Sequence, residues 1–315
     1  MSRGIRKYVR HCGRYGLRAH FIQVAYFPYT LPRKSVRQRS FQETMPARRN
    51  LNNRNARRYL EALVETNFRK DDLLVSLSYS EENMPDGIGE AKRKFHNFIR
   101  RLNRKRKAMG MPNAKYIVVT EINAKGKAHH HVIMDAMVDR DTVEKIWGQG
   151  RANTKRIQPD TKRHLLPVIN YIAKAFKETK GKPERMRRWD SSKDNLKKPW
   201  VSINDNPRMM SHKKMKLMQD LPEDSECMKK IIELDNPHYE LIDVEKEHCE
   251  EMGEWHFFCR MRLSTKSTSG IVHKLVGERE KKSLSPKQEG NQCRKKPGRH
   301  GNARAKPPPG STGPP

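Results

Sequence analysis

Apolar and β-branched residues form three short runs in the middle of the chain, and each run predicts a strand. Residues 73–79 and 116–121 are rich in Leu, Val, Ile and Tyr, and residues 128–134 form the third run. Between the last two runs, residues 123–126 read Asn-Ala-Lys-Gly, which has the composition of a tight turn. The second and third runs are therefore expected to pair as an antiparallel hairpin.

Around these runs, apolar residues recur at intervals of three and four, which predicts helices. The clearest cases are residues 90–109, whose other side is rich in Arg and Lys, and residues 164–177. A further helix precedes the first strand, Asp139 or Asp141 is expected to cap a short one, and residues 151–157 form a weak strand. This mixture predicts a folded α+β unit.

The two ends of the chain differ in composition from its middle. Residues 1–52 are strongly basic and contain three prolines, which predicts an irregular arm that lies on nucleic acid or stays disordered. Residues 263–315 are dominated by Ser, Lys, Gly and Pro, which predicts a disordered basic tail. Between them we expect a folded domain at 53–207 and a small accessory α/β segment at 208–262.

The charge of the chain indicates a polyanionic partner. Lys and Arg number 67 against 36 acidic residues, which gives a formal net charge of +31. Nucleic acid is the default partner of such a chain, because cationic side chains that neutralise phosphates release condensed counterions. The sequence contains no apolar run long enough to cross a membrane and no apolar segment of a secretory signal, and its five cysteines are scattered. A cytoplasmic protein that does not bind membranes is expected.

Three consecutive histidines lie in the third predicted strand. Successive side chains of a strand point to opposite faces, so His129 and His131 share one face while His130 faces the other. The hairpin brings Glu121 back alongside them as a third ligand. Two imidazoles and one carboxylate suit Mg²⁺ or Mn²⁺ acting on a phosphodiester, although zinc accepts the same ligands. The alternative is a solvated surface tract of histidines.

A second candidate pair lies in the predicted helix at 164–177. Tyr171 and Lys174 are one turn apart and lie off the apolar stripe of that helix. A phenolate at Tyr171 is a candidate nucleophile towards a phosphodiester, and Lys174 is placed to stabilise the charge that develops there. The alternative is a tyrosine that covers the edge of the core.

In this order, the metal strand and the Tyr-x-x-Lys helix resemble the HUH endonuclease superfamily. Within it, the chain is most similar to the replication-associated proteins of phages and small plasmids, akin to the filamentous-phage gene II initiators. The segments 147–150 and 195–199 also look like that group. The resemblance covers roughly residues 55–205 and implies a central antiparallel sheet flanked by helices. His130 replaces the usual apolar middle residue, so a register with His130 as the ligand stays open.

The resemblance also implies a reaction. The expected protein is a rolling-circle replication initiator that nicks and rejoins one DNA strand at an origin through a covalent 5′-phosphotyrosine. Its partners would be single-stranded or hairpin origin DNA, a host polymerase and a host helicase, since the chain has no P-loop. The basic residues of the 90–109 helix are candidates for DNA contacts: Arg93, Lys94, Arg100, Arg101, Arg104 and Lys105.

Three alternatives remain open. Conjugative relaxases and single-tyrosine transposases share this chemistry and differ in biological use. A non-catalytic basic protein that binds nucleic acid, such as a plasmid copy-control factor, would explain the charge but leaves the ordered His, Glu and Tyr residues unexplained. A zinc-dependent hydrolase with another substrate is the third alternative. The oligomeric state is not predicted.

Overall fold

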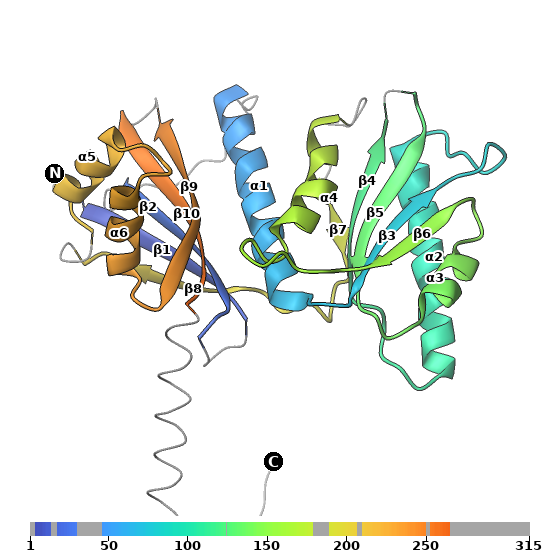
Figure 1. The fold of residues 1–315 in the computed structure, drawn as a ribbon. Helices are drawn as coiled ribbons and strands as arrows, with labels where there is room; N and C mark the ends of the chain where they lie inside the picture. The colour runs from blue at the N-terminus through green and yellow to red at the C-terminus, as the bar shows by residue number, and fades with distance from the viewer. Residues whose placement is uncertain are drawn as a thin grey trace, which may run out of the picture. The chain divides into compact units, whose positions relative to one another are not determined.

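The computed structural model describes residues 4–13, 18–29, 46–123, 125–178, 189–206, 210–249 and 253–264. Within these residues the chain forms two five-stranded antiparallel sheets and six helices (Figure 1). The predicted α+β class is therefore confirmed, but there are two sheets rather than one central sheet. Among the described helices, none combines the length and the apolar character that crossing a membrane requires.

The second sheet in chain order contains the three predicted strands. Its strand order is β6-β3-β5-β4-β7. The predicted hairpin is present, since β4 and β5 pair antiparallel with Glu121 opposite His129. The bounds of these strands are β3 (Leu73–Ser78), β4 (Tyr116–Ile122), β5 (Ala128–Met134), β6 (Ala152–Arg156) and β7 (Asp190–Ser191).

Helices cover both faces of the second sheet (Figure 1). On one face α2 (Ile88–Ala108) and α3 (Arg140–Trp147) bury Phe95, Phe98 and Trp147 against β3 and β5. On the other face α1 (Pro46–Asn67) and α4 (Leu166–Glu178) pack against β4 and β5. The predicted N-cap of α3 is Asp139, whose side chain accepts a hydrogen bond from the Thr142 amide at 2.8 Å.

The first sheet corrects the expectation of an irregular arm at residues 1–52. Two strands form there, β1 (Gly4–Cys12) and β2 (Phe21–Tyr29), and α1 begins at Pro46. Prolines misled the prediction because the two that the structure describes occupy tolerated positions, and Pro32 lies outside the described residues. Pro46 starts a helix, where its missing N–H has no intrahelical partner in any case. Pro28 lies near the end of β2, beyond the residues that pair with β10 (Glu254–Leu263).

The first sheet joins segments that are far apart in the sequence. Its strand order is β8-β1-β2-β10-β9, with β8 (Trp200–Asn204) and β9 (Tyr239–Cys249) at the edges. Helices α5 (His212–Asp220) and α6 (Glu226–Asp235) pack on it through a core of Met, Val and Phe side chains. The predicted arm and accessory segment therefore share one sheet. The four-part domain division stays a prediction, and the predicted disordered tail lies, beyond Ser264, outside the described residues.

A buried ion pair attaches α1 to the first sheet. Arg260 of β10 donates to both carboxylate oxygens of Glu61, at 2.8 and 3.1 Å, and Glu61 is fully buried. Gln23 of β2 donates to the same carboxylate at 3.2 Å. Because α1 also packs on the second sheet, this helix contacts both sheets.

Candidate active site

The turn of the β4–β5 hairpin sets the register of the candidate site. The Asn123 side-chain oxygen accepts hydrogen bonds from the backbone amides of Lys125 and Lys127, both at 3.0 Å. Gly126 has φ +75°, a left-handed conformation that glycine adopts without strain. This turn aligns Glu121 with His129, and Val119 with His131.

The three histidines divide between the two faces of the sheet as the strand period predicts. His130 is fully buried and uses both ring nitrogens, with the Tyr79 hydroxyl at 2.7 Å and the Thr120 hydroxyl at 2.9 Å. Burial away from water lowers the pKa of His130 to about 3, so the ring is neutral. In this register His130 packs in the core on the α2 side of the sheet, and both its ring nitrogens are occupied, so it is not available as a ligand.

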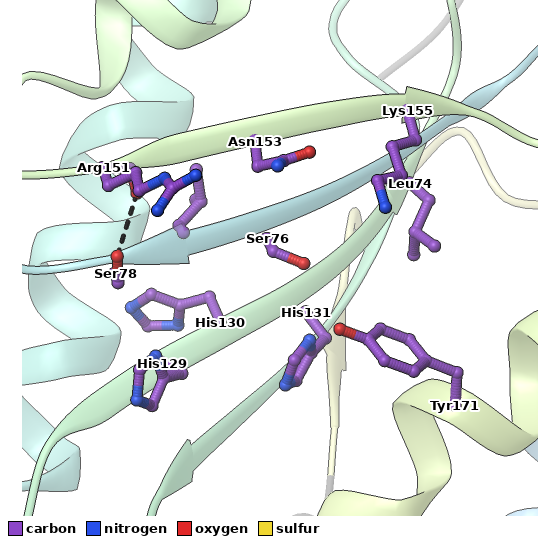
Figure 2. Close-up of a pocket in the computed structure, with 11 residues that line it drawn as sticks. Leu74, Ser76, Ser78, His129, His130, His131, Arg151, Asn153, Lys155 and Tyr171 are labelled. Carbon is purple, nitrogen blue, oxygen red and sulfur yellow. Dashed lines mark hydrogen bonds between the residues drawn. The ribbon is translucent and has the colours of Figure 1, made fainter.

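His131 and Glu121 contact each other on the opposite face. The His131 Nε2 lies 3.0 Å from a Glu121 oxygen, while its Nδ1 is buried and has no hydrogen-bond partner. Tyr171 extends from α4 towards the same ring, with the ring centroids 5.2 Å apart in an edge-on arrangement (Figure 2). The hydrogen bond from His131 holds the pKa of Glu121 below its ordinary value.

His129 lies beside the turn rather than against the other two predicted ligands. The Asn123 amide donates to His129 Nε2 at 3.0 Å, and burial lowers the pKa of His129, so this imidazole is also neutral. Among the described residues, one group of His, Cys, Asp or Glu side chains has three ligand atoms within 4.8 Å of one another. That group is His20, Glu65 and His164, and it is not the predicted set.

The donors of the predicted set nevertheless fit a divalent cation. Imidazole nitrogens and an ionised carboxylate are ligand types that divalent cations accept, and the lowered pKa of His129 keeps a lone pair available on that ring. The unpartnered, buried Nδ1 of His131 is a polar atom that a cation or a bound water would satisfy. Lys174 is exposed on α4, and its charge also lowers the pKa of Glu121.

A groove runs from these histidines across β3 to β6 (Figure 2). Its volume is about 540 Å³, within the range of small-molecule sites. The strand register builds it, since His131 pairs with Ser76 and Ser76 pairs with Asn153. Arg151 and Lys155, two residues before and two residues after Asn153, also line the groove.

The predicted site contained no residue of β3 or β6. The weak strand at 151–157 was expected, and its polar residues at every second position were the signal that could have identified the groove. Which face they occupy depends on pairing with β3, and single-sequence patterns do not give that pairing.

The predicted DNA-binding residues lie on a different side. Helix α2 packs on the face of the second sheet opposite His131 and Tyr171. Arg101 donates to the backbone oxygens of Ile146 and Trp147, and Lys94 donates to that of Asn83. Arg93 pairs with Glu90 and Arg100 contacts Asn97, but both side chains are exposed, as are those of Arg104 and Lys105. A DNA contact by this helix stays a prediction.

Comparison with known proteins gives one family match. Residues 72–178, from the start of β3 to the end of α4, match the model of a replication-associated protein family, that of the ORF2 and phage gene II proteins. Comparisons with curated proteins and with solved structures found no significant match. The matched span contains Glu121, His129, His131, Tyr171 and Lys174. Over residues 72–178, the chain is therefore similar to the replication-associated protein family of the filamentous-phage gene II type.

Proposed function

We propose that this protein is a rolling-circle replication initiator, an HUH-type endonuclease that nicks and rejoins one strand of origin DNA. The observation that carries the proposal is the contact of the Tyr171 ring with His131, which itself contacts Glu121. The tyrosine ring lies 5.2 Å from the His131 ring, and His131 lies 3.0 Å from Glu121. A half-exposed tyrosine beside a carboxylate–imidazole pair, in a groove with cationic edges, suits attack on a phosphodiester.

In the proposed reaction the Tyr171 oxygen attacks the phosphorus of one phosphodiester. The new bond joins tyrosine to the 5′ phosphate, the bond to the 3′ oxygen breaks, and that oxygen takes a proton as the phenol loses one. A 3′ hydroxyl is released to prime synthesis. The reverse reaction, with the 3′ hydroxyl as attacking group, rejoins the strand and frees the tyrosine.

The residues around the nucleophile have separate tasks. His129, His131 and Glu121 would hold Mg²⁺ or Mn²⁺, which supplies Lewis-acid polarisation of the phosphate. Lys174 stabilises the negative charge that develops on the phosphoryl oxygens. Arg151 and Lys155 at the β6 edge of the groove bind the neighbouring backbone phosphates.

The proposed DNA partner is single-stranded or hairpin DNA of an origin. The net charge of +31 supports non-specific phosphate contacts, to which the exposed Arg104 and Lys105 of α2 would contribute. Strand opening and synthesis would come from a host helicase and polymerase in the cytoplasm. A relaxase or a single-tyrosine transposase would use the same residues, so the proposal commits to the chemistry of the site and to origin DNA as its substrate.

The test is covalent capture of DNA by the full chain. Labelled single-stranded DNA tiled across the sequence around the gene is incubated with protein and Mn²⁺, and adducts are separated on a denaturing gel. A labelled adduct is expected that Tyr171→Phe abolishes. The matched control is Tyr59→Phe, because Tyr59 stacks on Trp189 and keeps its ring in that variant. An adduct of normal yield in Tyr171→Phe would exclude this nucleophile, and salt-sensitive binding without any adduct would favour the non-catalytic DNA-binding protein.

A further inference from the structure

A second cluster of metal-binding side chains lies away from the groove. It consists of His20, just before β2, Glu65 near the end of α1, and His164, just before α4. The His20 Nε2 lies 3.4 Å from a Glu65 oxygen, and the His164 Nδ1 lies 2.5 Å from the same oxygen. All three ligand atoms lie within 4.8 Å of one another.

The protein holds these side chains in place. Glu65 is fully buried, and its other oxygen accepts a hydrogen bond from the Leu165 amide at 2.9 Å. His164 has φ +49°, a left-handed backbone that non-glycine residues adopt only where the surroundings enforce it. Two backbone hydrogen bonds with Asp160, at 2.8 and 3.0 Å, fix that conformation and direct the ring towards Glu65.

The two histidines balance the charge of Glu65, and a bound cation would take over that role. Burial alone would lower the pKa of His164, but the hydrogen bond with Glu65 and its charge raise it above its ordinary value, so metal binding would displace a proton from this ring. Burial on its own would raise the pKa of Glu65, but the hydrogen bonds from His164 and His20 and their charges lower it below its ordinary value. A buried carboxylate that stays ionised requires positive charge beside it. The two imidazoles are partly exposed, with side-chain exposures of 44% for His20 and 37% for His164, so an ion and its water ligands have access from solvent.

We infer that His20, Glu65 and His164 form a second metal site, which binds a zinc-like divalent ion. Two imidazole nitrogens and one carboxylate oxygen are a ligand set of zinc sites that keep a position for water. Bonds of about 2.0–2.2 Å at tetrahedral angles place ligand atoms about 3.4 Å apart. The His20–Glu65 separation already has that value, and the ion would replace the shorter His164–Glu65 hydrogen bond.

The site would connect three segments that pack around a small shared core. Cys12 and Phe21 of the first sheet, Ala62 of α1 and Leu166 of α4 form that core. A bound ion would fix the start of α4 relative to α1 and β2. It would therefore act on stability and on the position of α4, and it is separate from the His129, His131 and Glu121 set.

The experiment counts metal ions on untagged, full-length protein. The double variant His129→Ala/His131→Ala removes the other proposed site and serves as the background. After EDTA treatment and dialysis, Zn²⁺ binding is measured by calorimetry, and Co²⁺ binding by visible absorption. One ion per chain is expected, with the absorption of a four- or five-coordinate Co²⁺ site.

Adding His20→Gln or His164→Gln to this background should weaken Zn²⁺ binding by at least about tenfold, since each removes one ligand. Zn²⁺ should raise the melting temperature of the background protein and not that of the added variants. His96→Gln, a change of an exposed histidine on α2, is the matched control and should leave one ion bound. Equal Zn²⁺ affinity with and without His20 and His164, or no binding in the background, would overturn the inference. Neither result depends on whether Tyr171 forms a DNA adduct.

Discussion

Replacing Gly150 with alanine should destabilise the protein severely, because this position has no room for a side chain. A Cβ at Gly150 would lie 2.4 Å from the Ser80 nitrogen and 2.6 Å from both the Ser78 oxygen and the Tyr79 carbonyl carbon. All three are backbone atoms at the end of β3, so no side-chain rotation relieves the overlap. Gly150 also has φ +150°, which side-chain-bearing residues rarely adopt.

The cost follows from what must move. The segment is tied to β3 by two backbone hydrogen bonds of 2.9 Å, from the Ser78 amide to the Arg151 oxygen and from the Ser80 amide to the Gln149 oxygen. Separating the strands to admit a methyl group would break both, at about 1 kcal/mol each. The disfavoured backbone adds about 1–3 kcal/mol. A loss of about 3–5 kcal/mol is expected, a large fraction of the stability of a typical domain.

Urea unfolding followed by circular dichroism and by Trp fluorescence measures this loss. The matched control is Gly89→Ala at the start of α2, where no atom lies within 4 Å of an added Cβ. That change should be neutral or stabilise the helix by up to about 1 kcal/mol. If Gly150→Ala unfolds at the same urea concentration as Gly89→Ala, the close approach of residues 147–151 to β3 is wrong.

Three further predictions concern other parts of the molecule. Arg260→Met should lower the free energy of unfolding in urea by about 3–5 kcal/mol, because it leaves the buried Glu61 carboxylate without its two-point partner. The control Arg262→Met, at a partly exposed ion pair, should lower it by less than about 1 kcal/mol, and equal losses would contradict this expectation. Burial lowers the pKa of His11 to about 4, so the unfolded chain takes up the proton first, and the stability of the wild type relative to His11→Phe should fall as the pH drops from about 6.5 to about 4. A constant difference in unfolding free energy across that range would contradict this prediction. Lys155→Ala should reduce the slope of log affinity against log salt concentration for single-stranded DNA by about 0.7, and the control Lys216→Ala, at an exposed lysine, should leave it unchanged. An unchanged slope in Lys155→Ala would show that Lys155 makes no DNA contact.

The local part of the candidate site could be predicted from the sequence because one hairpin contains it. The alternation of side chains along a strand separates His129 and His131 from His130, and a short turn returns Glu121 to the same face. Sequence spacing alone does not fix which ring nitrogen faces which neighbour. The Nε2 of His131 contacts the Glu121 carboxylate, whereas the Nε2 of His129 contacts the Asn123 amide of the turn.

The missed features all depend on contacts between distant segments. Strand β1 alternates buried and half-buried positions, but a buried lysine, Lys7, interrupts the apolar pattern. Its ammonium group lies 2.8 Å from Asp235 of α6, more than two hundred residues away in the chain. A lysine is rarely buried without such a partner, so the pattern reads as an exposed basic arm until the pairing is known. The groove residues of β6 were missed for the same reason.

The position of the proposed nucleophile also depends on residues outside its motif. Tyr171 is on the exposed side of α4 because Ile169 and Ile172 are buried against the second sheet. The start of that helix is held by Glu65, which accepts from the Leu165 amide. Glu65 lies outside the family match at 72–178, as does the whole of α1. The Tyr-x-x-Lys pattern therefore supplies the proposed nucleophile, while the start of its helix is held by a buried carboxylate over a hundred residues earlier.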